Sequence, residues 1–85
     1  MRVQLRYFAS LREALGPGET IDWEPSGPAT VGALRHWLRA RSTAAAEVLG
    51  TGRSVRVAVD LDMASEDTPL RDGAEVAFFP PVTGG

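Results

Sequence analysis

The stretch RVQLRYF, residues 2–8, alternates apolar and polar side chains. In an extended segment, Val3, Leu5 and Tyr7 fall on one face and the intervening residues fall on the other. This period of two is typical of a β-strand that is buried on one side. Phe8 continues the polar side, which predicts an exposed aromatic ring at the end of the strand.

The next two segments predict a short helix and a second strand. In SLREALGPG, residues 10–18, Ser10 and Glu13 have the spacing of a capping box, and Gly16 predicts the end of the helix. The segment ETIDWE, residues 19–24, alternates again. It predicts a strand that forms a hairpin with the first one.

The main helix is predicted at residues 31–41, VGALRHWLRAR, with Thr30 as its N-cap and an apolar stripe along one side. Apolar alternation then predicts strands at residues 54–59 and 74–79, and a short strand at 61–64. The first and last strands are the most apolar, so they are expected side by side at the centre of the sheet. The order of elements predicts an α+β fold, a mixed sheet with the main helix packed across one face.

Length and composition narrow the classes of function. The 85 residues are enough for one small domain, and 44% hydrophobic with 24% charged residues is typical of globular proteins. A net charge of −2 argues against a nucleic-acid partner, and the absence of a long apolar run argues against a membrane partner. A cytoplasmic location is therefore expected. The chain has no cysteine and no lysine, which excludes disulfides, thiol nucleophiles and Schiff-base chemistry on its side chains.

The side chains give little support for catalysis or metal binding. His36 is the only histidine and falls within the main helix. Asp60, Asp62, Glu66 and Asp67 lack the glycine and the final glutamate of a calcium loop. We therefore expect that this chain itself binds no metal and no cofactor.

The end of the chain, FFPPVTGG, carries the strongest functional signal. We predict a domain at residues 1–79 and an extended tail at residues 80–85. Proline fixes φ, so Pro80 and Pro81 favour an extended path away from the sheet. Gly84 and Gly85 have no side chains, so they fit a channel that excludes other residues.

The terminal carboxylate of Gly85 is then the candidate reactive group. A carboxylate is a poor electrophile until it is activated, for example as a mixed anhydride with AMP. No ATP-binding motif is present, so a partner would have to activate it. Because cysteine is absent, any sulfur carried by this chain would be held on that carboxyl carbon as a thiocarboxylate.

The sequence resembles the MoaD family, the small subunits of molybdopterin synthase. The resemblance covers nearly the whole chain, and it rests on YFASLREALG, TVGALRHWL and above all LRDGAEVAFFPPVTGG. It implies a ubiquitin-like β-grasp fold. It also implies that an adenylating enzyme of the MoeB type uses ATP and magnesium to form a glycyl-adenylate at Gly85, which a sulfur donor protein converts to the thiocarboxylate.

The same resemblance implies partners and contact residues. The tail would insert into the large subunit, of the MoaE type, and donate sulfur to cyclic pyranopterin monophosphate within a heterotetramer; catalytic side chains would belong to the large subunit. The inserted residues would be Pro80, Pro81, Val82, Thr83 and Gly84. The partner interface would include Phe8, Met63 and Phe79, although the alternation alone places Met63 inside, on the face of Val57 and Val59.

Other functions remain open at this point. The chain could carry sulfur for thiamin, tRNA thiolation or cysteine synthesis. It could also be a ubiquitin-like modifier, because an activated glycine can be transferred to a lysine of another protein. A binding module with an aromatic patch is a further alternative, but it leaves the Gly-Gly end unexplained.

Overall fold

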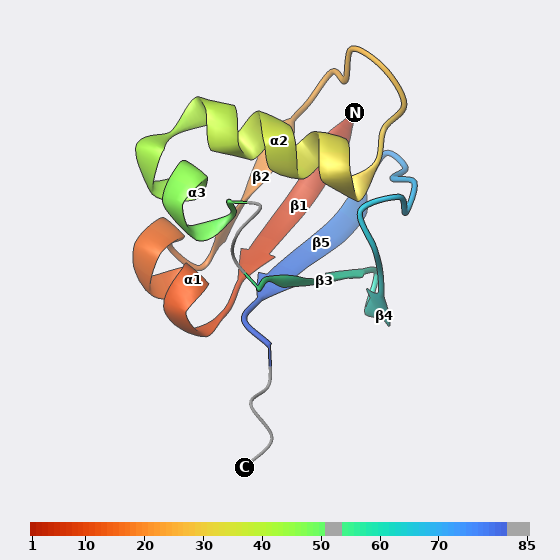
Figure 1. Cartoon of the computed structure of the whole chain (residues 1–85). Coiled ribbons are helices and arrows are strands. Elements are labelled where there is room, and N and C mark those ends of the chain that lie inside the picture. The colour runs from red at the N-terminus through yellow and green to blue at the C-terminus, as the bar shows by residue number, and fades with distance from the viewer. Residues whose placement is uncertain (51–53, 82–85) are drawn as a thin grey trace.

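A computed structural model describes residues 1–50 and 54–81 of the chain. The described residues form a five-stranded sheet in the order β2-β1-β5-β3-β4, with three helices (Figure 1). The elements are β1 (Arg2–Tyr7), α1 (Ala9–Leu15), β2 (Gly18–Asp22), α2 (Val31–Arg41), α3 (Thr43–Val48), β3 (Arg56–Val59), β4 (Asp62–Met63) and β5 (Ala74–Phe79). β1 and β5 are parallel neighbours, and the other pairs are antiparallel. The predicted central pair and the predicted β1–β2 hairpin are both confirmed.

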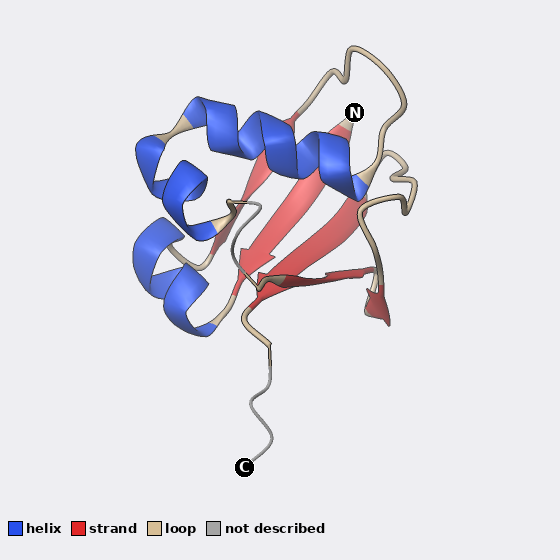
Figure 2. Ribbon diagram, in the orientation of Figure 1, coloured by secondary structure: helices blue, strands red, loops and turns tan. Residues whose placement is uncertain are grey.

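All three helices lie on one side of the sheet, and no helix of residues 1–50 and 54–81 covers its other face (Figure 2). The predicted stripe of α2 is confirmed, since Val31, Leu34 and Leu38 are fully buried. Thr30 begins this helix as predicted, because its side-chain oxygen accepts a hydrogen bond from the backbone N–H of Ala33 at 3.1 Å. The helix therefore covers the inner face of the sheet, and that fixes which face remains for contacts.

The predicted capping box of α1 is wrong. The helix begins at Ala9, so Ser10 lies inside its first turn and Phe8 occupies the N-cap position. In the described part of the chain no side chain caps this end. The extended strand continues through Phe8, and the chain turns at Ala9 with a positive φ of 52°. The end of the helix is as predicted, at Gly16 with a φ of 88°.

The far end of α2 is tied to the β1–β2 hairpin by a bidentate ion pair. The Arg41 guanidinium donates to both carboxylate oxygens of Glu19, at 3.0 and 2.7 Å, and it lies over the ring of Trp37. The ion pair raises the pKa of Arg41. Burial, helped by the negative charge of Glu19, raises the pKa of Tyr7 to about 12. Tyr7 therefore stays neutral well above the range in which an exposed tyrosine ionises.

Candidate functional site

The uncovered face of the sheet carries a row of side chains that crosses four strands. In the strand register, Arg6 on β1 lies opposite Ala77 on β5, Ala77 lies opposite Ala58 on β3, and Ala58 lies opposite Met63 on β4. Strand neighbours share a face, so these residues all project away from the helices. The small alanines leave the middle of this face low and apolar.

Two aromatic residues stand at the end of the same face. Tyr7 pairs with Phe78, and the backbone N–H of Phe8 donates to the carbonyl oxygen of Phe78 at 3.2 Å. The structure therefore places Phe8 beside Phe79, as the alternation predicted. Phe8 is 46% exposed, and Phe79 is partly exposed. We call Phe8, Ala58, Met63, Ala77 and Phe79 the outer-face patch.

Met63 belongs to this patch, and the expectation from alternation that it lies inside is wrong. Its side chain is 62% exposed. The turn between β3 and β4 contains two residues, Asp60 and Leu61, so Val59 pairs with Asp62 and Ala58 pairs with Met63. Met63 therefore shares the face of Ala58 and not that of Val57. The exposure fits the interface position that the family resemblance implied, whereas its role in binding stays a prediction.

Charged groups border the outer-face patch. Arg6 forms an ion pair with Glu75 at 3.5 Å, and Arg56 lies opposite Phe79 and is exposed. Asp60 fixes the nearby turn, because its carboxylate accepts from the backbone N–H of Glu75 at 3.0 Å and its own N–H donates to the Glu75 carbonyl at 2.9 Å. The patch is thus an apolar strip with both signs of charge at its rim, which is the usual composition of a protein contact surface.

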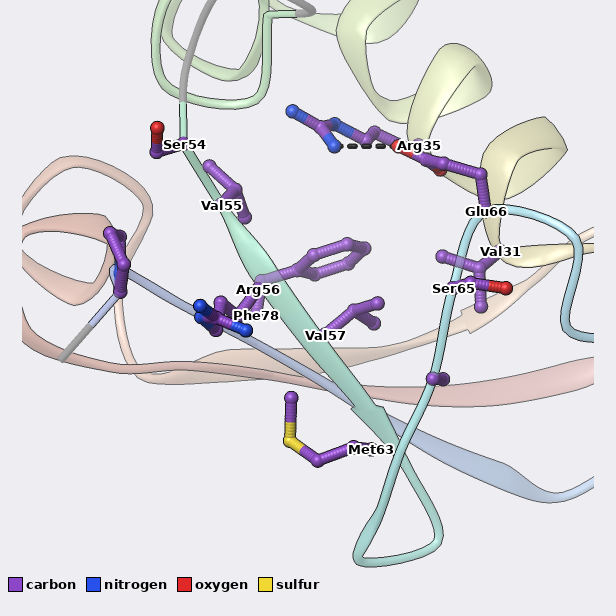
Figure 3. Close-up of a pocket in the computed structure, with 12 residues that line it drawn as sticks. Val31, Arg35, Ser54, Val55, Arg56, Val57, Met63, Ser65, Glu66 and Phe78 are labelled. Carbon is purple, nitrogen blue, oxygen red and sulfur yellow. Dashed lines mark hydrogen bonds and ion pairs between the residues drawn. The ribbon is translucent and has the colours of Figure 1, made fainter.

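A pocket of about 420 Å³ lies along the edge of β3, between that strand, α2 and residues 63–66 (Figure 3). Val31, Val57 and Phe78 form part of its apolar lining, and Met63 and Pro81 contribute to the lining as well. Arg35 and Glu66 face one another across the part of the pocket next to α2 (Figure 3).

Arg35 is a clamp inside the protein and not a free cation for a ligand. Its guanidinium donates to Glu66 Oε1 at 2.7 Å, to the Leu49 carbonyl at 2.7 Å and to the Gly50 carbonyl at 2.9 Å. These bonds join α2 to the end of α3 and to the loop before β5. Sequence reasoning missed Arg35, because nothing local in the sequence indicates that its partners, 14 to 31 residues away, would meet it.

The last strand ends at Phe79, where the predicted tail begins. Pro80 and Pro81 are partly exposed, and each contributes to the lining of a surface pocket. The predicted tail residues Val82, Thr83, Gly84 and Gly85 lie outside the described residues. The chain therefore leaves the sheet next to Phe8 and Phe79, at one end of the outer-face patch.

Within residues 1–50 and 54–81, no three histidine or acidic side chains come together in a way that could hold a metal ion. None of the helices in this described part is long and apolar enough to cross a membrane.

The fold is the β-grasp, in which a mixed sheet holds a long helix across one face, and it places the chain among the ubiquitin-like proteins. Comparison with known proteins then gives the family. Residues 5–85 match the ThiS family, so the chain belongs to that family. The expected β-grasp fold and the resemblance to the MoaD family are confirmed.

Three relatives show how close the match is. The chain is 43% identical over 83 residues to the molybdopterin synthase sulfur carrier subunit of Escherichia coli, covering 98% of this chain and 99% of the relative. It is 37% identical over 98 residues to small archaeal modifier protein 3 of Haloferax volcanii, with both chains fully covered. A solved structure of a putative molybdopterin converting factor subunit 1 from Pyrococcus furiosus superposes with a TM-score of 0.78 at 32% identity, covering 96% of this chain and 99% of that one.

Proposed function

We propose that this protein is the sulfur-carrying small subunit of a molybdopterin synthase. The single observation that carries the proposal is the 43% identity, over nearly the full length of both chains, to a sulfur carrier subunit of that enzyme. The match to the ThiS family also extends through Gly85, the residue on which the chemistry would take place.

The proposed chemistry uses the main-chain carboxylate of Gly85. A MoeB-type enzyme, with ATP and magnesium, joins this carboxylate to AMP and releases pyrophosphate. A hydrosulfide ion supplied by a donor protein attacks the carbonyl carbon, AMP leaves, and loss of the proton gives the thiocarboxylate. In the large subunit the sulfur then passes to cyclic pyranopterin monophosphate, and water supplies the oxygen that restores the carboxylate of Gly85. ATP and magnesium act at the partner enzyme, and this chain holds neither.

The outer-face patch suits the contact with a large subunit of the MoaE type in a heterotetramer. Clustered exposed aromatic side chains are typical of binding hot spots. Phe8 and Phe79 stand where the chain leaves the sheet, so a partner that covers them also receives the tail. The six residues after Phe79 can reach about 20 Å when extended, which is long enough to enter a neighbouring active site.

A second function is favoured by one observation, the 37% identity to a small archaeal modifier protein. The same glycyl-adenylate can be attacked by an amine, which would join Gly85 to a lysine of another protein. Sulfur delivery to other pathways, namely thiamin, tRNA thiolation or cysteine synthesis, uses the same first two steps. The difference lies in what accepts the activated group.

Intact-mass measurement tests the proposal. The protein is incubated with its adenylating enzyme, ATP, magnesium and a sulfur donor, and the chain without Gly85 serves as the control. We expect the mass change of one oxygen-to-sulfur exchange in the full chain and none in the control. The thiocarboxylate form, mixed with large subunit and cyclic pyranopterin monophosphate, should yield molybdopterin. An unchanged mass under conditions that convert a known carrier would overturn the proposal, and amide adducts without molybdopterin would favour the modifier. Action in the cytoplasm stays a prediction that cell fractionation can check.

A further inference from the structure

Leu61 is the most exposed large apolar side chain in the described part of the chain, at 89%, and Met63 follows at 62%. It occupies the second position of the two-residue turn between β3 and β4, with a φ of 73° after 49° at Asp60. Turns with two positive φ values favour Asn, Asp and Gly, because a branched or bulky side chain is crowded by its own backbone in that region.

The stability of the free domain does not account for a leucine at this position. Its side chain is almost wholly in water, so it adds little to the hydrophobic core. Glycine or asparagine would fit the same turn with less strain. Backbone strain together with an exposed apolar side chain is typical of a residue that is used in a contact.

The two exposed aromatic rings are too small to form a subunit contact alone. A stable subunit interface buries about 800 Å² on each partner, which is roughly one seventh of the 5340 Å² that this chain exposes. Phe8 is 46% exposed and Phe79 less, so the two rings together supply at most roughly 200 Å². The rest of such an area has to come from the inserted tail and from other parts of the outer face, so the two rings alone do not make up the contact.

The row of apolar side chains on the outer face leads to the turn that carries Leu61. From Phe79 this row passes Ala77 and Ala58 to Met63. The turn that carries Leu61 lies at one end of β3, and Arg56, which pairs with Phe79, lies at the other end (Figure 1). We infer that Leu61 is part of the interface with the large subunit and forms its outer end, an inference that rests on the proposed function. Since Asp60 and Asp62 flank it and are exposed, the matching site on the large subunit is an apolar recess with basic side chains at its rim.

Leu61→Gly tests this, because it removes the side chain while suiting the turn. Binding of the MoaE-type large subunit to the full chain is measured by calorimetry, and thermal unfolding is measured on the same samples. We expect Kd to rise about tenfold or more, a change typical of a lost interface anchor, with an unfolding midpoint that is unchanged or higher. Leu61→Met keeps an apolar side chain and should bind within about threefold of the original. Glu13→Ala, an exposed change on the helix side, should leave Kd unaltered.

Each other outcome overturns the inference in a recognisable way. If the original chain binds and Leu61→Gly binds equally well, Leu61 lies outside the interface and the proposed function stands. If Leu61→Gly binds weakly and also unfolds at a lower temperature, the effect comes from the turn and not from the side chain. If it binds normally but no longer gains the thiocarboxylate, the contact belongs to the activating enzyme. If the original chain does not bind the large subunit, the proposed function fails together with the inference.

Discussion

Phe78 and Phe79 are neighbours in the sequence with opposite surroundings. Phe78 is fully buried, and its ring stacks on Tyr7 with centroids 6.3 Å apart. Phe79 lies on the uncovered face beside Phe8, because successive side chains of a strand point to opposite sides. One ring therefore serves the core, and the other is available to a partner.

We predict opposite effects for alanine at these two positions. Phe79→Ala should weaken binding to the large subunit by about 1–3 kcal/mol, the range for an interface anchor, and should change the free energy of unfolding by less than about 1 kcal/mol. Phe78→Ala should lower the free energy of unfolding by about 3–5 kcal/mol, because it leaves a cavity in the core. Calorimetric binding and urea unfolding measure the two quantities. A Phe79→Ala chain that unfolds, beside a stable Phe78→Ala chain, would mean that the faces are reversed.

The strand faces could be predicted from the sequence where a strand is long enough to show its alternation. Phe8 and Phe79 were assigned correctly on that basis. Met63 was not, because the face of a two-residue strand depends on the length of the preceding turn and not on its own pattern. Asp60 and Leu61 make that turn with two positive φ values. Asp60 is a residue that such a turn favours, but leucine stands where glycine is usual, so the Asp-Gly or Asn-Gly signal of this turn is absent from the sequence.

Side-chain contacts between distant segments cannot be predicted from the sequence, for a different reason. Arg35 falls in the middle of a helix, where an arginine is ordinarily solvated. Its carbonyl partners become available only because α3 ends beside α2. Those bonds depend on the packing of the completed fold, which no local pattern specifies.

Arg35→Ala should destabilise the domain by about 2 kcal/mol. The main reason is the loss of two charge-assisted hydrogen bonds to the carbonyl groups of Leu49 and Gly50, while the half-exposed Glu66 adds little. The midpoint of urea unfolding measures the effect. Arg71→Ala, at an exposed position in the loop before β5, is the matched control and should stay within about 0.5 kcal/mol of the original. Equal midpoints for the two variants would show that the clamp adds nothing.

Stability should fall as the pH rises from about 10 to about 12. The pKa of Tyr7 is raised to about 12 in the folded state, so the phenol ionises first in the unfolded chain. A raised folded pKa gives stability that is complete below the unfolded pKa and is lost as the pH approaches the folded value. The loss should be roughly 2–3 kcal/mol across this window.

The composition of the chain allows a loss of stability between about pH 10 and about pH 12 to be assigned to one side chain. Tyr7 is the only tyrosine, and the chain has no lysine and no cysteine, so no other side chain of ordinary pKa titrates there. Urea unfolding at several pH values should show the decline in the original protein and a nearly flat profile in Tyr7→Phe. Parallel declines in both proteins would place the cause elsewhere.

The proline pair should matter for sulfur transfer and not for folding. Pro80 and Pro81 follow the last residue of β5, so replacing both with glycine leaves the sheet and the core unchanged. Each glycine increases the conformational freedom that is lost when the tail enters a partner, by about 0.4–1 kcal/mol. The double variant should therefore transfer sulfur to the large subunit's substrate about 4–30 times more slowly in single-turnover experiments, at subsaturating concentration. The unfolding midpoint should stay the same. Replacement of both prolines by alanine restores part of the stiffness, so its rate should lie between the other two. Equal rates for all three proteins would show that the tail is ordered by its partner at no measurable cost, and a lower unfolding midpoint would show that the prolines pack on the domain.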